Sequence, residues 1–396
     1  MIVAVELYRS VSRYAAARAV GPRATSGIAA QLAPLRLVTR PEPEPHGPGW
    51  ARLRPHLSGI CGSDLATVTG RSSLYLSPLV SFPFVPGHEV VGELLDDAGE
   101  LPRGTRVVVD PVLSCRPRGL EPCAQCRTGA TSRCDHITVG DLSPGLQSGY
   151  CTDAGGGWAR RMLVHRDQLH PVPDDLPDER AVLVEPLACA VHAVRRARVF
   201  EGDQVLVVGA GTVGLLTLVA LRALSVATQI AVVAKHPHQA DLARAFGATT
   251  VVAPDRAAQA LRRATRAFLL RPERGQPLLL GGADVAFECT GSPAGFDLAA
   301  RSVTAAGQVV LTGMPTGGVD LTPVWFRELE LIGAYASDSS GREHDMATAI
   351  ELARSTNTSA LLGGVYPLEG WRDALDHALS AGSLGTAKVA FDPRQD

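Results

Sequence analysis

Lysine is almost absent from this chain of 396 residues: Lys235 and Lys388 are its two lysines, and arginine carries the rest of the basic charge. Net charge is also nearly absent, because 38 Lys+Arg stand against 40 Asp+Glu, a formal net charge of −2. Binding nucleic acid through its phosphates, or a membrane through a polybasic patch, requires an excess of positive charge. We therefore expect neither nucleic acid nor a membrane as a partner.

Long apolar runs are lacking too. The longest, residues 205–224, is broken by glycines and by Arg222, whereas a membrane-spanning helix needs about 20 consecutive apolar residues. Residues 1–6 show no charged start followed by an apolar stretch, so no signal peptide is recognised. We expect a cytoplasmic protein, whose eight cysteines serve metal binding or catalysis more readily than disulfides.

The character of the sequence changes near residue 175. Before it, short strand-like runs such as 90–95 and 106–109 are separated by glycine and proline, a pattern typical of an irregular β region. After it, buried strand runs such as 204–208 alternate with helical stretches, which predicts a doubly wound parallel sheet of the α/β class. The segment 256–282 is expected to add a helix and a surface loop, and after about residue 335 we expect helix, strand, helix, strand.

A glycine-rich turn follows the first of these strands and opens a helix. It fits the pattern G-x-G-x-x-G in the context that dinucleotide binding requires. The first glycine allows a tight turn, the second lets the backbone approach a pyrophosphate at the helix amino terminus, and the third lets helix and strand pack closely. The predicted cofactor-binding residues of the turn are Gly209, Gly211, Thr212, Val213 and Gly214.

The end of the next strand bears on the choice of cofactor. An NAD-binding strand normally ends in a carboxylate about 20 residues beyond the glycine turn, and this carboxylate bonds the ribose 2′-hydroxyl. Here Ala234 holds that place, and Lys235 and His236 follow it, so a 2′-phosphate would be attracted instead of repelled. This favours NADP(H) over NAD(H). The alternative is a solvated strand end with no part in binding.

Four cysteines gather within residues 115–134. Their spacing, C-x7-C-x2-C-x7-C, suits four thiolates that close a tetrahedral zinc site, and the prolines and glycines around them suit a loop wrapped around a metal. Disulfides, or a redox-active C-x-x-C pair, are the alternatives. The predicted ligands are Cys115, Cys123, Cys126 and Cys134.

A second set of ligand types is more dispersed. Cys61 lies in the string G-I-C-G-S-D, and His88 and Glu89 lie in P-G-H-E. One thiolate, one imidazole and carboxylates on separate loops form the mixed set of a catalytic zinc with an open position. Glu185 lies in an apolar run, where a buried carboxylate needs a partner or a metal, unless it caps its own helix.

Together these motifs resemble the zinc-dependent medium-chain dehydrogenase/reductase superfamily, the alcohol, sorbitol and threonine dehydrogenase group. The resemblance extends over nearly the whole chain and includes E-P-L-A at 185–188. It implies a GroES-like catalytic domain over residues 1–170 with a structural zinc lobe at about 112–136, a Rossmann dinucleotide-binding domain over 171–335, and a return to the catalytic domain over 336–396.

The resemblance also implies roles for individual residues. It places a catalytic zinc on Cys61 and His88 and a structural zinc on the four lobe cysteines, two Zn²⁺ per chain. Ser63 matches the hydroxyl that touches the substrate oxygen. The exchangeable carboxylates are Glu89 and Glu185, and Cys189 is a reserve ligand. Thr290 and Gly313 are two later cofactor-binding positions.

Three features depart from the family pattern. Ala66 stands where a histidine often ends the proton relay, Cys115 is widely spaced from the other lobe cysteines, and a loop-rich insertion of unfamiliar length fills residues 7–35. The first departure leaves the route of the proton open. The insertion is expected to shape the substrate cleft or a subunit contact.

The favoured function is that of a zinc-dependent oxidoreductase that transfers hydride between NAD(P)(H) and a secondary alcohol, a polyol or the corresponding carbonyl compound. Zinc would act as a Lewis acid on the substrate oxygen, and Ser63 would relay the proton. We expect a small-molecule substrate and a homodimer or homotetramer. One alternative is a biosynthetic reductase of an unsaturated aldehyde, ketone or imine. Another is a non-catalytic cofactor-binding relative, against which the intact ligand set argues.

Overall fold

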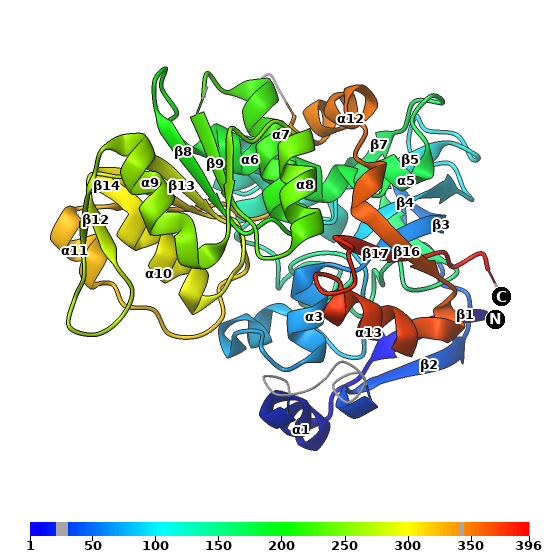
Figure 1. Cartoon of the computed structure of the whole chain (residues 1–396). Coiled ribbons are helices and arrows are strands. Elements are labelled where there is room, and N and C mark those ends of the chain that lie inside the picture. The colour runs from blue at the N-terminus through cyan, green and yellow to red at the C-terminus, as the bar shows by residue number, and fades with distance from the viewer. Residues whose placement is uncertain (21–30, 228, 340–343, 396) are drawn as a thin grey trace. The chain divides into compact units, whose positions relative to one another are not determined.

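The computed structural model describes four stretches of the chain, residues 1–20, 31–227, 229–339 and 344–395 (Figure 1). Two compact units divide the chain: Met1–Glu185 with Ser337–Asp396 form the first, and Pro186–Ala336 form the second. The domain limits expected from the sequence remain predictions. Of the helices in the described stretches, none combines the length and the apolar composition that a membrane crossing requires.

The first unit is built on a seven-stranded sheet. Its longest strand, β3, pairs antiparallel with β4, β6 and β17. Aliphatic side chains of β3, β4, β5 and β6 share a common core, as a sequence with few aromatic residues requires. In sheet order the strands are β16 (Leu362–Tyr366), β17 (Lys388–Phe391), β3 (Trp50–Gly59), β4 (Glu89–Leu94), β5 (Arg106–Val109) and β7 (Leu169–Pro171), with β6 (Met162–His165) beside β3.

The second unit holds a parallel six-stranded sheet, which confirms the predicted doubly wound fold. The strand order changes direction between β8 and β13, and in such sheets a ligand binds beyond the carboxyl ends of the strands at this point. The glycine-rich turn directly follows β8, so it lies where a cofactor is expected. In sheet order the strands are β10 (Thr250–Val252), β9 (Gln229–Val233), β8 (Gln204–Val208), β13 (Ala283–Glu288), β14 (Val303–Leu311) and β15 (Glu330–Gly333).

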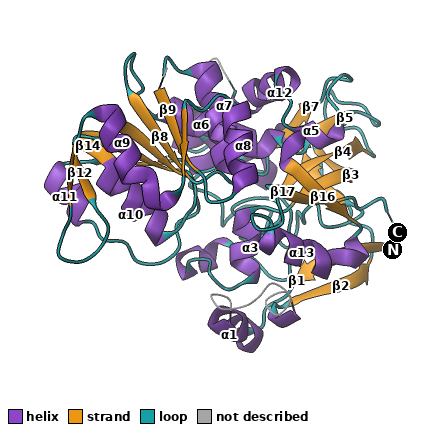
Figure 2. Ribbon diagram, viewed as in Figure 1, coloured by secondary structure: helices purple, strands orange, loops and turns teal. Residues whose placement is uncertain are grey.

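Helices cover both faces of this parallel sheet (Figure 2). On one face lie α7 (Thr212–Leu224) and α8 (Pro237–Ala245), and on the other α9 (Ala257–Thr265) and α10 (Pro293–Ser302) pack against strand side chains. Residues 214–221 of α7 are all buried, which explains why the longest apolar run of the sequence is a core helix.

Two regions differ from the expectation. The insertion at 7–35 carries a helix, α1 (Val11–Val20), in addition to loops, and residues 21–30 of it lie outside the described residues. The segment 256–282 adds the expected helix, α9, and the expected surface loop at residues 271–276, but that loop joins two strands that were not expected, β11 (Phe268–Leu270) and β12 (Leu278–Leu280). Periodicity alone does not identify apolar runs as short as these.

The remaining elements belong mainly to the first unit. After the second unit, the chain adds α12, β16, α13 and β17, the predicted order of helix, strand, helix, strand. Two strands not yet described, β1 (Ile2–Leu7) and β2 (Leu35–Arg40), pair antiparallel. The remaining helices are α3 (Gly62–Val68), α4 (Ala124–Arg127), α5 (Asp178–Ala181), α6 (Val184–Arg196), α11 (Thr322–Arg327), α12 (Asp345–Ser355) and α13 (Trp371–Ser380).

Three buried aspartates face one another where β5 leads into the cysteine-rich loop. Asp110 accepts a hydrogen bond from the Val112 N–H at 3.1 Å, and the Asp338 N–H donates to Asp345 at 2.8 Å. Burial, and then the charges of Asp338 and Asp345, raise the pKa of Asp110 to about 7. The native state therefore prefers Asp110 in its protonated form.

We expect Asp110→Asn to stabilise the protein at neutral and higher pH. The pKa of Asp110 lies above its ordinary value of 3.8. The contribution of protonated Asp110 to the free energy of unfolding is therefore fully present below pH 3.8 and is lost as the pH rises through about 7. Asparagine keeps an oxygen for the Val112 N–H without a charge. Thermal melts should therefore show a gain of several degrees near pH 8 and a smaller gain near pH 5. Asp174→Asn, at an exposed position, is the control, and a gain that does not depend on pH would contradict the burial argument.

Candidate active site and zinc lobe

Strand ends of the first unit bring three predicted ligands together. Cys61 caps α3 directly after β3, His88 precedes β4, and Glu89 is the first residue of β4. One ligand atom of each residue lies within 4.8 Å of the others. His88 and Glu89 are buried, whereas Cys61 is partly exposed. We call these three residues the Cys–His–Glu cluster. It is buried on one side and accessible on another, as a metal site with an open position requires.

Glycines in the two motifs allow this close approach. Antiparallel pairing puts Gly59 of β3 opposite Glu89 of β4, and a Cβ at Gly59 would overlap Oε2 of Glu89. Gly87 has a φ of 95°, in the left-handed region, and a Cβ there would overlap the ring of Trp158. Both motifs therefore need glycine so that the residues after it reach the cluster.

Asp64 orients the imidazole of the cluster. Its Oδ2 accepts the Cys61 N–H at 2.9 Å, and its Oδ1 lies 3.5 Å from Nδ1 of His88. A carboxylate behind a ligating histidine fixes the ring and strengthens it as a ligand. Burial opposes a charged imidazole, yet the charges of Asp64 and Cys61 outweigh burial and raise the pKa of His88 well above its ordinary value. The donor set thus favours a positive charge at this place, which a metal ion would supply in place of the proton.

Lys388 pairs with the carboxylate of the cluster. Its Nζ donates to both carboxylate oxygens of Glu89, each at 2.6 Å, and to the carbonyl of Ile60 at 3.2 Å. The lysine is only 4% exposed. Burial opposes its charge, but the attraction of Glu89, Cys61 and Glu185 outweighs burial and raises the pKa of Lys388. Glu89 is therefore shared between an ammonium group and the ligand cluster.

Other predicted residues of this site lie on two helices. Ser63 is in the first turn of α3, and its carbonyl accepts the Thr67 hydroxyl at 2.9 Å. Glu185 is buried in the first turn of α6, and its charge acts on Lys388. Within the described chain, its oxygens are not part of the group of close ligand atoms that the Cys–His–Glu cluster forms. Cys189 lies further along α6, in the second unit.

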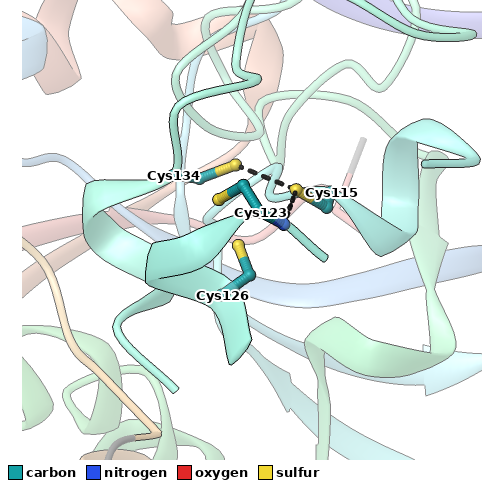
Figure 3. A group of neighbouring side chains, drawn as sticks. All are labelled: Cys115, Cys123, Cys126 and Cys134. Atoms are coloured by element: carbon teal, nitrogen blue, oxygen red, sulfur yellow. Dashed lines mark hydrogen bonds between the residues drawn. The ribbon is translucent and has the colours of Figure 1, made fainter. Parts of the chain in front are cut away.

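The four lobe cysteines converge in the loop between β5 and β6 (Figure 3). Their sulfur atoms all lie within 4.8 Å of one another, and those of Cys115 and Cys134 are 3.5 Å apart. A disulfide needs about 2.05 Å, and all eight cysteines are free. Sulfurs about 2.3 Å from a tetrahedral zinc are about 3.8 Å apart. The lobe therefore fits zinc and not a disulfide. Although seven residues separate Cys115 from Cys123, the sulfur of Cys115 reaches the other three.

Hydrogen-bond donors already face these sulfurs. The Cys123 N–H donates to Sγ of Cys115 at 3.3 Å, and the His136 N–H donates to Sγ of Cys134 at 3.4 Å. Nδ1 of His136 lies 3.3 Å from Sγ of Cys115. Hydrogen bonds to a charged group favour the charged form, so these donors favour the thiolate that binds a metal. They act against burial, which raises the pKa of the Cys126 and Cys134 thiols.

The glycine-rich turn of the second unit has room for a dinucleotide. Gly209 has a φ of 98°, and a Cβ at Gly214 would overlap the carbonyl of Gly209. A Cβ at Gly211, by contrast, would have no described atom within 4 Å. The open space lies at the N-cap of α7, which begins with Thr212 and Val213. A helix amino terminus beside open space suits the pyrophosphate of a dinucleotide.

Two more predicted cofactor residues follow the neighbouring strands. Thr290 follows β13, Gly313 follows β14, and a buried glutamate anchors both. The carboxylate of Glu288 accepts the N–H groups of Thr290 at 2.8 Å and Gly291 at 3.0 Å, and its carbonyl accepts the Gly313 N–H at 2.9 Å. A Cβ at Gly209 would overlap the Thr290 side chain. Thr290 therefore borders the glycine-rich turn, and Gly313 is held close to it.

Ala234, Lys235 and His236 continue from the carboxyl end of β9. Ala234 is buried, Lys235 is exposed, and His236 caps α8 with its ring stacked on His238 at 5.9 Å between centroids. Burial, and then the charges of Lys235 and His238, lower the pKa of His236. This strand end therefore carries the positive charge of Lys235, with no acidic side chain among residues 233–238.

Three residues near the Cys–His–Glu cluster escape prediction from the sequence. Asp64 directly follows a predicted residue and could be found from its motif. Lys388 could be noticed because lysine is so rare, although nothing in the sequence gives its partner. Tyr150 comes from a distant loop, and its ring centroid lies 6.0 Å from that of His88. Burial, and then the charge of Asp64, raise the pKa of Tyr150, so its hydroxyl stays protonated.

We expect Lys388→Met to destabilise the metal-free protein by about 3–5 kcal/mol, because it leaves the Glu89 carboxylate buried without a partner. Urea unfolding measures the loss. Lys235→Met changes the other lysine of the chain, which is exposed, and should unfold like the wild type. Adding Glu89→Gln to Lys388→Met should recover much of the stability. Wild-type stability of Lys388→Met would show that the ion pair does not hold this site together.

Comparison with known proteins gives a family for each half of the chain. Residues 47–174 match the family described as alcohol dehydrogenase GroES-like domain, and residues 212–366 match the family described as zinc-binding dehydrogenase. The second unit has the parallel sheet of a Rossmann domain. The expected combination of a GroES-like domain with a Rossmann sheet is confirmed.

Individual relatives extend over most of the chain. Sorbitol dehydrogenase of Arabidopsis thaliana is 30% identical over 296 residues, which are 73% of this chain and 74% of that protein. (R,R)-Butanediol dehydrogenase of Bacillus subtilis strain 168 is 30% identical over 286 residues, 70% of this chain and 73% of that protein. The structure of a zinc-binding dehydrogenase from Sinorhizobium meliloti 1021 bound to NADP superposes with a TM-score of 0.72 at 24% identity, covering 99% of this chain and 100% of that chain.

Proposed function

Because the chain belongs to the zinc-containing medium-chain dehydrogenase/reductase superfamily and is a zinc-dependent, NAD(P)-dependent oxidoreductase of the alcohol dehydrogenase type, we propose that its substrate is a secondary alcohol or polyol. The observation that carries the proposal is the Cys–His–Glu cluster, whose donor atoms lie within 4.8 Å of one another. The relatives named for sorbitol and butanediol support a substrate with several hydroxyl groups. The cluster also argues against a non-catalytic relative, in which a ligand set has no reason to stay intact.

The residues of the site have separate proposed roles in metal binding and proton transfer. We assign Cys61, His88 and Glu89 to the catalytic metal, with Glu185 as an exchangeable carboxylate nearby, and the lobe cysteines to a structural one. When bound, zinc would polarise the substrate oxygen as a Lewis acid, and the nicotinamide would exchange the hydride. Ser63 takes the proton of the substrate hydroxyl during oxidation and returns it during reduction.

For the cofactor, we propose a preference for NADP(H). Its 2′-phosphate would lie at the carboxyl end of β9, and residues 233–238 there contain Lys235 and two histidines without a carboxylate. Burial, and then the charge of Lys235, lower the pKa of His236, so its imidazole is uncharged near neutral pH and Lys235 carries the positive charge at this place. A phosphate dianion gains from that charge, whereas a ribose hydroxyl gains little.

For the assembly and the compartment, we propose a homodimer or homotetramer in the cytoplasm. Trp325 and Phe326 of α11 are 79% and 66% exposed, and they lie near β15, at the edge of the parallel sheet. Exposed aromatic side chains beside an edge strand favour contact with a second copy. The eight free cysteines suit a reducing compartment.

We expect purified protein to bind two zinc ions per chain and to oxidise members of a panel of secondary alcohols and polyols. Cys61→Ala should lose one zinc and all hydride transfer. It should still bind NADPH, because the glycine-rich turn belongs to the other unit. Elemental analysis, nicotinamide absorbance and nicotinamide fluorescence give the three readouts. Retained turnover in Cys61→Ala would reject the proposed site, and turnover of carbonyl compounds alone would favour the biosynthetic reductase.

NADPH should bind about one to two orders of magnitude more tightly than NADH, because a charge-assisted contact contributes about 1.5–3 kcal/mol. Ala234→Asp should reverse the order by placing a carboxylate against the 2′-phosphate. Ala245→Asp adds the same charge at an exposed position at the end of α8 and should leave the ratio unchanged. Fluorescence titration gives both dissociation constants. Equal affinities in the wild type would leave Lys235 as a solvated residue with no part in binding.

A further inference from the structure

The site has no histidine at the position where the family often ends its proton relay. Ala66 stands there, and it is 5% exposed, so neither its side chain nor bulk water can take a proton at that place. We propose that the hydroxyl groups of Tyr150, Thr67 and Ser72 carry the substrate proton between Ser63 and solvent.

These hydroxyls form a row that leads away from the Cys–His–Glu cluster. The Tyr150 hydroxyl lies 3.5 Å from Oγ1 of Thr67, and it is near enough to the side chain of Ser63 for that side chain to act on its pKa, which it lowers. Oγ1 of Thr67 lies 3.0 Å from Oγ of Ser72. Tyr150 is buried, whereas Ser63, Thr67 and Ser72 are partly exposed. The outer part of the row therefore leads from the buried tyrosine to the surface.

Packing restricts the position of the Tyr150 hydroxyl. The ring centroid of Tyr150 lies 5.4 Å from that of Phe84 and 6.0 Å from that of His88. Its carbonyl accepts the Ser81 N–H at 3.4 Å, and its own N–H donates to the Gln147 carbonyl at 3.1 Å. A ring held from both sides and a fixed backbone leave the hydroxyl little freedom beyond rotation of its proton.

The row balances one proton for each hydride. During oxidation, the hydride leaves the carbinol carbon for the nicotinamide, and the hydroxyl proton of the substrate passes to Oγ of Ser63. Ser63 gives its own proton to Tyr150, Tyr150 gives its proton to Thr67, and Thr67 gives its proton to Ser72, which releases one to water. Each neutral hydroxyl donates once and accepts once, and reduction runs the same steps backwards.

The step between Tyr150 and Thr67 is wide, at 3.5 Å. In the described structure, the Thr67 hydroxyl donates to the Ser63 carbonyl at 2.9 Å, so it must turn before it passes a proton to Ser72. Catalytic hydrogen bonds are often long in the absence of substrate and tighten in the complex. Closure of this step is therefore tied to occupation of the site.

The unusual insertion holds the outer end of the row. In α1, the Tyr14 hydroxyl donates to the Ser72 carbonyl at 3.4 Å, and Nη1 of Arg18 donates to the Gly70 carbonyl at 3.1 Å. A Cβ at Gly70 would press against the Arg18 side chain. The helix that distinguishes this chain from the family pattern thus positions the segment that carries Ser72. Two departures from that pattern, Ala66 and the insertion, then serve the same route.

The relay rests on the proposed role of Ser63 next to the substrate oxygen, and Tyr150→Phe tests it. Single turnovers of the zinc-loaded enzyme, with oxidised cofactor and an alcohol that the wild type accepts, are followed by nicotinamide absorbance and by a pH indicator. In weak buffer near pH 7, we expect hydride transfer and proton appearance to slow at least about tenfold. A high concentration of HEPES, a bulky buffer base that is a poor ligand for zinc, should restore most of the rate, because a dissolved base takes the proton in place of the missing hydroxyl. Zinc content and NADPH affinity should stay at wild-type values.

Thr67→Val is the second variant and should behave in the same way. Its matched control is Thr69→Val, since the Thr69 hydroxyl donates to the Leu65 carbonyl at 2.6 Å, outside the row. Tyr366→Phe is the control for the tyrosine, because its hydroxyl is bonded to His377 at 2.9 Å in another part of the unit. Both controls should turn over like the wild type and gain nothing from the added buffer.

Three results would overturn the relay: wild-type rates in both Tyr150→Phe and Thr67→Val, slow rates that concentrated buffer does not restore, or a loss of zinc that accounts for the slow rates. The last two would make the hydroxyls structural only. Failure of the proposed function would be seen separately. If the wild-type enzyme oxidised no alcohol in the panel, the proposed function would be rejected before any variant was compared.

Discussion

The ammonium of Lys388 and the carboxylate of Glu89 meet in a place where neither charge would be tolerated alone. Their contact joins the first residue of β17 to the first residue of β4, and the same ammonium binds the carbonyl of Ile60 after β3. Three strand ends are thus held together beside the Cys–His–Glu cluster. The ligand geometry depends on this pair, because the ammonium of Lys388 binds both oxygens of Glu89 and so holds them at the cluster.

The two metal sites are built in different ways. The lobe takes its ligands from twenty consecutive residues, 115–134, and backbone N–H groups of the same loop face the sulfurs. Such a site forms as its own loop closes around a metal. The Cys–His–Glu cluster takes its ligands from the ends of two strands and relies on Asp64 and Lys388 behind them. It is formed by the sheet and not by a loop, which suits a site whose ligands must leave one position open.

Sequence alone reveals the parts of this protein whose chemistry is local. The glycine-rich turn, the cysteine lobe and the strings around Cys61 and His88 can each be recognised from a short stretch of sequence. The doubly wound sheet follows from the alternation of strand and helix patterns after residue 175. What lies beyond prediction depends on contacts across the fold: Lys388 is 299 positions from Glu89, and Tyr150 is 83 positions from Thr67. The hairpin of β11 and β12 is hidden for another reason, because three apolar residues do not define a strand.

The place of β17 near the end of the chain has a consequence for biosynthesis. Strands β3 and β4 leave the ribosome early, whereas the lysine that neutralises Glu89 follows about three hundred residues later. Until then, Glu89 must remain hydrated or uncharged, so the nascent first unit cannot close around its ligands. The Rossmann sheet is complete before that moment, since all of its strands precede β16. The chain therefore finishes its cofactor-binding unit first and its active site last, and a shortened chain that lacks β17 would lack a closed active site.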